Sequence, residues 1–126
     1  QKQLSKEIKI TSIEGRFKKI SNISEMEFIL LKKNGVFENG YNKLYPTLNI
    51  KYFREYMNYM DLRITFDSNI QYHFNNCYYY NDFENVIEIK TSLNKSINII
   101  EKIIPIKISR FSKYCRGLLI QQKQAT

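Results

Sequence analysis

Residues 61–67 alternate strictly between polar and apolar side chains. Because successive side chains of a β-strand point to opposite sides, this pattern predicts a strand with one polar and one apolar face. The polar face carries Asp61, Arg63, Thr65 and Asp67, and the apolar face carries Leu62, Ile64 and Phe66. In the strand predicted at residues 86–90, Glu88 and Lys90 share one face, and Ile87 and Ile89 share the other. The chain is therefore expected to build a sheet with a charged face.

Further strands are predicted at residues 6–10 and 47–56. In the second of them Arg54 shares a face with Tyr52, two residues before it. Residues 70–82 are rich in tyrosine and asparagine and have no clean period, so both a strand and a loop fit this segment.

Four segments carry helical signals. Helices are predicted at residues 11–20, 24–34, 93–104 and 109–119. Thr11 with Glu14, and Ser24 with Glu27, have the spacing of a capping box, and Ser109 is the expected cap of the last helix. Because helices and strands mix without a linker or an internal repeat, the sequence predicts one α+β domain.

The chain of 126 residues carries 20 lysines and arginines against 12 aspartates and glutamates, a formal net charge of +8. This excess favours an anionic partner, a class that includes nucleic acid, phosphate compounds and membrane surfaces. Cys77, Cys115 and a single histidine are too few for a disulfide framework or a zinc site. Unpaired cysteines, and the lack of a signal peptide or a long apolar run, lead us to expect a cytoplasmic location.

Two interpretations of the polar strand faces are open. In the first, they belong to an antiparallel sheet and face water. In the second, they line a water-filled lumen, while the apolar faces pack outward against helices. The combination of Arg63, Thr65, Glu88 and Lys90 favours the second interpretation, because these residue types suit a site for phosphate and metal.

Four segments, in order along the chain, carry a family resemblance. They are Tyr-Phe-Arg-Glu-Tyr at 52–56, Asp-Leu-Arg-Ile-Thr-Phe-Asp-Ser-Asn-Ile at 61–70, Val-Ile-Glu-Ile-Lys at 86–90 and Arg-Phe-Ser-Lys-Tyr-Cys-Arg-Gly at 110–117. Together they resemble the second half of a VTC domain, the polyphosphate polymerase module of the vacuolar transporter chaperone complex and its bacterial relatives. The resemblance implies a triphosphate tunnel metalloenzyme, an antiparallel β-barrel with a polar lumen and flanking helices. Residues 1–126 would form the C-terminal part of that domain.

The resemblance also implies an activity and its residues. The activity is transfer of the terminal phosphate of ATP to a growing polyphosphate chain, with Mn²⁺ or Mg²⁺ as the divalent metal. The implied phosphate-binding residues are Arg54, Arg63, Lys90, Ser112, Lys113 and Arg116, the metal ligand is Glu88, and the catalytic residues are Arg54, Arg63, Lys90 and Lys113. A surface arginine, a surface ion pair and a solvated helix face are the simpler alternatives. For Asp67 and Asn69 a role in a turn fits at least as well as a role in the site.

An earlier half of the family domain, with an Arg-x-Arg strand and another Glu-x-Lys strand, is not recognisable upstream of Lys51, and residues 5–9 resemble at most its end. A fragment of a longer polypeptide is therefore expected. A chain completed by another subunit and a half retained for binding are the alternatives. The other functions considered are a polyphosphate-binding module without turnover and a nucleic-acid binder that stacks bases on Tyr78, Tyr79 and Tyr80. Other domains would bring the chain to the cytosolic face of a membrane.

Overall fold

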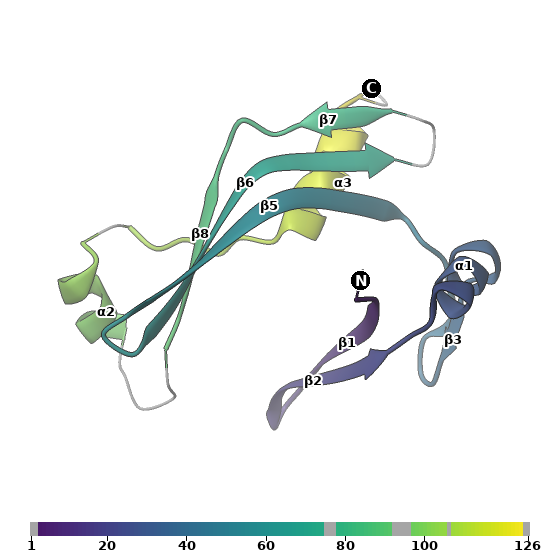
Figure 1. Cartoon of the computed structure of the whole chain (residues 1–126), viewed down its shortest axis with the longest axis horizontal. Helices are drawn as coiled ribbons and strands as arrows, with labels where there is room; N and C mark the ends of the chain where they lie inside the picture. The colour runs from purple at the N-terminus through teal and green to yellow at the C-terminus, as the bar shows by residue number, and fades with distance from the viewer. Residues whose placement is uncertain (1–2, 75–77, 92–96, 106, 125–126) are drawn as a thin grey trace. The chain divides into compact units, whose positions relative to one another are not determined.

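The computed structural model describes residues 3–74, 78–91, 97–105 and 107–124. The chain divides into two compact units, Gln1–Pro46 and Thr47–Thr126. Its described elements are drawn in Figure 1. Both units combine helix with antiparallel strands, which confirms the predicted α+β class.

The first unit begins with a hairpin of β1 (Ser5–Ser12) and β2 (Gly15–Asn22). The helix predicted at residues 11–20 is wrong, because these residues form the end of β1, the turn and most of β2. Gly15, with a φ of 139°, takes a backbone conformation that favours glycine, and it brings Ile10 opposite Phe17 across the hairpin. The apolar residues therefore pair between strands instead of following a helical period.

The predicted capping box at Ser24 is confirmed. Helix α1 (Glu25–Asn34) begins after Ser24, whose side-chain oxygen accepts a hydrogen bond from the Glu27 amide at 3.2 Å. The Glu27 carboxylate accepts one in return from the Ser24 amide at 2.7 Å, so two N–H groups at the start of the helix are satisfied.

The first unit ends in a short hairpin of β3 (Val36–Glu38) and β4 (Asn42–Leu44). None of the described residues of this unit is buried. Two-stranded hairpins without an apolar face against another layer are marginal in water. The first unit therefore lacks a core of its own among the residues described.

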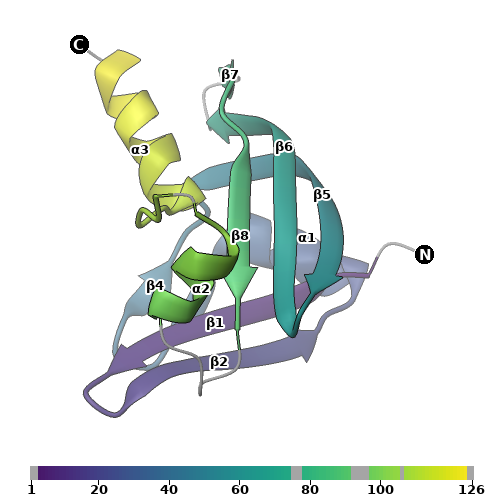
Figure 2. The ribbon, with the colours of Figure 1, turned by 90° about the vertical axis from the view of Figure 1, so that its left-hand side faces the viewer.

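The second unit is built on one antiparallel sheet. Its strands are β5 (Leu48–Tyr59), β6 (Leu62–Phe74), β7 (Tyr79–Asn81) and β8 (Val86–Lys90). The central strand, β6, pairs with β5 on one side and with β7 and β8 on the other, as Figures 1 and 2 show. Among the described residues the sheet stays open, so a closed barrel is not seen.

A β-bulge at Asn69 changes the phase of β6. Lys51 pairs with Gln71, but Phe53 pairs with Ser68, so β6 carries one residue more than β5 at this point. Asn69 has a left-handed φ of 50°, a conformation that asparagine tolerates. Because of the bulge, the odd-numbered polar residues before it and the even-numbered apolar residues after it point to the same face.

That shared face holds the core of the second unit. The fully buried Ile70 and Tyr72, together with Phe74, form its centre. The residues packed around them are Leu48, Ile50, Tyr80, Val86 and Ile120. Ile120 comes from the last helix, α3 (Lys113–Gln124), so α3 covers this face of the sheet.

One of the two helix predictions near the C-terminus needs a correction. The helix expected at 109–119 begins four residues later, because Ser112 and not Ser109 lies at its start: the Ser112 carbonyl accepts the Arg116 amide at 3.0 Å. The helix expected at 93–104 is seen as α2 (Ile97–Ile103), and residues 92–96 lie outside the described part.

The expectation that apolar strand faces pack against helices is wrong for α3. This helix lies on the face that continues the polar residues, whereas Phe53, Met57 and Ile87 on the opposite face are more than half exposed. The bulge explains the difference, because it moves the apolar end of β6 to the polar side.

Gly117 is predicted to be required for the close approach of α3 to the sheet. A Cβ atom at this position would lie 2.5 Å from Leu48 Cδ2 and 2.7 Å from Tyr72 Cδ1. We expect Gly117→Ala to lower the free energy of unfolding by about 1–2 kcal/mol, because overpacking outweighs the gain in helix propensity. Urea unfolding followed by circular dichroism measures the loss. An alanine variant that is more stable than the wild type would contradict the tight packing.

Candidate functional site

Cross-strand pairing gathers most of the predicted site residues on one end of the sheet. Three rows run across β5, β6 and β8, and their side chains share one face. The rows are Arg54, Asp67 and Val86; Tyr56, Thr65 and Glu88; and Asn58, Arg63 and Lys90. We call these nine residues the polar grid. Figure 2 shows the three strands side by side.

The outermost row of the polar grid places two cations directly opposite each other. Arg63 of β6 pairs in register with Lys90 of β8, and both residues are exposed. Like charges in directly opposed positions destabilise an antiparallel pair, since their Cβ atoms lie roughly 5 Å apart. An anion that binds between them removes this repulsion, so the geometry suits a phosphate group.

The middle row combines a carboxylate with a buried hydroxyl. Glu88 lies opposite Thr65, and its Oε1 forms an ion pair with Lys90 Nζ at 3.1 Å. Both side chains of this pair are about half exposed, so it contributes little to stability and leaves the carboxylate accessible. Thr65 is only 5% exposed, and its hydroxyl has no hydrogen-bond partner among the described residues.

The innermost row contains a buried carboxylate held by two cations. Asp67 is fully buried and accepts hydrogen bonds from Arg54 Nε at 2.5 Å and Nη2 at 2.7 Å. Lys113, the first residue of α3, forms an ion pair with Asp67 Oδ2. Tyr52 lies beside both cations, with its ring centre 5.0 Å from Arg54 Cζ and 4.9 Å from Lys113 Nζ. β5, β6 and α3 thus meet in one charged cluster.

The contacts between Asp67 and its two cations determine the ionisation of Asp67 and Arg54. Burial opposes the charged form of Asp67, but hydrogen bonds from Arg54 and Lys113 outweigh it, and the pKa of the carboxyl is lowered. The hydrogen bond to Asp67 in turn raises the pKa of Arg54. Asp67 is therefore ionised and Arg54 cationic at neutral pH.

Ser112 and Lys113 lie at the start of α3. The Ser112 hydroxyl accepts the Cys115 amide at 3.3 Å, as an N-cap does, and this fixes the start of α3. Lys113 then reaches Asp67 in the innermost row of the polar grid. The phosphate-binding roles of both residues stay predictions.

Arg116 lies in a second buried cluster, away from the polar grid. Its guanidinium donates to both oxygens of Asp82, at 2.5 and 2.8 Å, and Nη2 lies 3.3 Å from Glu84. Burial opposes ionisation of Asp82, but Arg116 lowers the pKa of this carboxyl overall. Burial, with the charge of Asp82, raises the pKa of Tyr72 to about 12, so this hydroxyl stays protonated. The phosphate-binding role predicted for Arg116 stays a prediction, and its visible contact is an ion pair that anchors α3.

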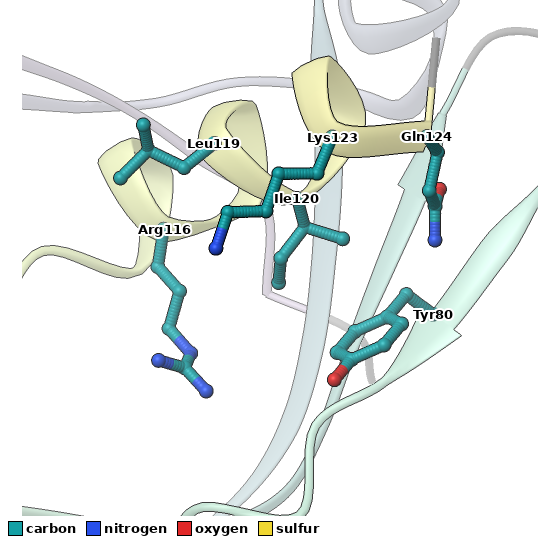
Figure 3. A pocket seen from close by; sticks show the side chains of 6 residues that line it. All are labelled: Tyr80, Arg116, Leu119, Ile120, Lys123 and Gln124. Carbon is teal, nitrogen blue, oxygen red and sulfur yellow. The ribbon is translucent and has the colours of Figure 1, made fainter. Parts of the chain in front are cut away.

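A shallow pocket of about 320 Å³ lies beside α3. Its lining residues, drawn in Figure 3, are Tyr80, Arg116, Leu119, Ile120, Lys123 and Gln124. Arg116 is the one predicted site residue that lines it. The remaining predicted residues belong to the polar grid or to the start of α3.

The predicted divalent metal fits the polar grid only as a metal bound together with phosphate. The described residues contain no group of three or more His, Cys, Asp or Glu side chains that could hold a metal. Glu88 offers a single accessible carboxylate. Magnesium is commonly bound by one or two carboxylates together with substrate phosphates, so Glu88 suits a metal that arrives with phosphate.

Sequence reasoning missed the central position of Asp67. For Asp67 a role in a turn was expected to fit at least as well as a role in the site, whereas this residue is the buried centre of the cation cluster. The strand predicted at residues 6–10 is confirmed as part of β1, on which Glu7 and Lys9 form an ion pair at 3.2 Å.

Fold and site together define an antiparallel sheet protein with a cationic face suited to phosphate. The family model of the VTC domain matches residues 1–121, so the chain belongs to the VTC domain family, which is related to polyphosphate polymerases. Comparisons with curated proteins and with solved structures gave no match. None of the described helices is long and apolar enough to cross a membrane.

Proposed function

We propose that the chain is the C-terminal part of a polyphosphate polymerase that transfers the γ-phosphate of ATP to a growing polyphosphate chain. The observation that carries this proposal is the opposed pair of cations, Arg63 and Lys90, next to the carboxylate of Glu88 on the polar grid. The polar grid and Lys113 combine four cations with two carboxylates, which leaves an excess of positive charge for the phosphates. Membership of the VTC domain family supports the same reaction.

Phosphoryl transfer asks the protein mainly for positioning and charge neutralisation. Arg54, Arg63, Lys90 and Lys113 are proposed to hold phosphate oxygens so that the terminal phosphate of the chain lies in line with the γ-phosphate. The bond between the γ-phosphorus and ADP then breaks while a new P–O–P bond forms. Glu88 would hold a divalent cation, Mn²⁺ or Mg²⁺, and the cation would supply charge neutralisation to the phosphates.

A tunnel would require more strands than the sheet of the second unit supplies. The described part of that sheet is open, and the described residues of the first unit form no core of their own. Both observations support the proposal that an N-terminal half of the domain, in the same or another chain, completes the barrel. Enclosure would exclude water and favour phosphate as the acceptor.

The experiment that tests the proposal compares synthesis with binding in the whole protein. We expect Glu88→Gln to lower polyphosphate synthesis from ATP and Mn²⁺ by at least about 100-fold, because metal contacts contribute several kcal/mol to the transition state. Binding of preformed polyphosphate without metal should change less than about threefold, because the proposed phosphate contacts come from cations and Glu88 contributes only through the metal. Glu55→Gln, which removes a carboxylate from the opposite face of β5, is the matched control.

Two results would point elsewhere. A wild-type protein that binds polyphosphate but forms none from ATP would favour the binding module without turnover. Preference for single-stranded RNA over polyphosphate would favour the nucleic-acid binder. The nucleic-acid binder would stack bases on Tyr78, Tyr79 and Tyr80. Two of these rings already stack on residues of β6, Tyr78 on Phe74 and Tyr79 on His73, with ring centres 6.0 and 5.9 Å apart.

A further inference from the structure

Asp67 is the most deeply buried charged residue of the polar grid, and it faces two cations from different elements. Its side chain is 1% exposed, whereas those of Arg54 and Lys113 are 25% and 16% exposed. The carboxylate therefore lies beneath the two cations, and the cations keep a solvent-accessible side. The cluster is open on the side from which a ligand can approach.

The donors of both cations exceed what Asp67 uses. A guanidinium has five N–H donors, and Asp67 accepts from Nε and Nη2 of Arg54. An ammonium has three donors, and one ion pair joins Lys113 to Asp67. Two positive charges against one carboxylate leave the cluster with one excess positive charge.

Without the carboxylate, the two cations would repel each other and turn toward water. Asp67 binds both of them, and the Tyr52 ring lies about equally close to both. A carboxylate that accepts two charge-assisted hydrogen bonds from one guanidinium also fixes the plane of that guanidinium. The orientation of Arg54 is therefore set before any ligand binds.

We propose that Asp67 is a positioning residue that aligns Arg54 and Lys113 so that both cations contact the same phosphate group of a polyphosphate chain. This inference rests on the proposed function, because it takes polyphosphate as the ligand of the polar grid. It adds a role for a residue that does not itself contact the anion. It also predicts that Arg54 and Lys113 act as one unit and not as two independent charges.

The test is a double-mutant cycle in the whole protein, with the dissociation constant of medium-chain polyphosphate measured by calorimetry without ATP. We expect Asp67→Asn to weaken binding about tenfold, although it removes a negative charge from the site. Arg54→Ala should weaken binding by a similar factor. The double variant should bind no more weakly than Arg54→Ala alone, because Arg54 has lost its alignment once Asp67 is changed.

Glu55→Gln is the matched control, since it removes a carboxylate from the opposite face of β5 and touches neither cation. It should bind polyphosphate as tightly as the wild type. Circular dichroism establishes whether each variant is folded. If Asp67→Asn does not fold, the cycle of Arg54→Ala with Lys113→Gln tests the same alignment, because two cations on one phosphate give non-additive losses.

The results separate the two proposals. A folded Asp67→Asn variant that binds as tightly as the wild type or more tightly, or strictly additive losses in the cycle, would overturn the positioning role and leave the proposed function standing. A wild-type protein that does not bind polyphosphate would overturn the proposed function itself.

Discussion

Replacing Arg63 by alanine in the whole protein is expected to lower polyphosphate synthesis from ATP by at least about 100-fold, the effect of removing one preorganised donor from a transition state. Arg63 is exposed and lies opposite Lys90, a like charge, so its removal relieves a repulsion and should not destabilise the sheet. The expected result is therefore loss of activity with an unchanged or slightly raised melting temperature. Activity is measured as polyphosphate formed per time, and stability by thermal unfolding.

Lys51→Ala is the matched control for Arg63→Ala. Lys51 is an exposed cation of the same sheet, but its pairing with Gln71 places it on the face opposite the polar grid. Both variants change the net charge equally, so they differ in the position of the lost cation. The control should keep nearly full activity, because Lys51 lies on the face opposite the polar grid. A folded Arg63→Ala protein that retains synthesis would remove Arg63 from the proposed site. Equal losses in both variants would reduce its role to general electrostatic attraction.

Strand faces and helix caps could be predicted where the signal is local. The capping box at Ser24 depends on residues three apart, and β8 has the bounds predicted from the alternation of residues 87–90. The polar faces that unite Arg63, Thr65, Glu88 and Lys90 were predicted from the same alternation, and the cross-strand register places them in adjacent rows. These features need no knowledge of distant parts of the chain.

The bulge at Asn69 could not be predicted in this way. Counting in steps of two from Arg63 reaches Asn69 and then Gln71 and His73, whereas the buried residues after the bulge are Ile70 and Tyr72. Alternation therefore suggested that the strand ends near Asp67, and it concealed that the polar grid and the core share one face. The cationic partners of Asp67 and Asp82 lie 13 to 46 residues away in sequence, on elements whose packing no local pattern reveals.

Arg116→Ala is the second variant with a large expected effect, and here the loss is one of stability. Arg116 donates to both oxygens of Asp82, whose side chain is 1% exposed. Removing the guanidinium leaves the buried carboxylate of Asp82 without its cation. It also removes the ion pair that joins α3 to the segment between β7 and β8. We expect the free energy of unfolding to fall by about 2–4 kcal/mol, below the upper range for such a loss because Arg116 itself is partly exposed.

The stability lost in Arg116→Ala should depend on pH, which a role of Arg116 in phosphate binding alone would not produce. The pKa of Asp82 is lowered in the folded protein, so the pair contributes fully above the ordinary carboxyl range and its contribution is lost as pH falls through the lowered value. The difference in stability between the wild type and Arg116→Ala should therefore be large at pH 7 and shrink at about pH 3. Urea unfolding at both pH values measures it, with Arg110→Ala, an exposed arginine before α3, as the control. An Arg116→Ala protein as stable as that control, but inactive in synthesis, would assign Arg116 to the phosphate and not to the anchor of α3.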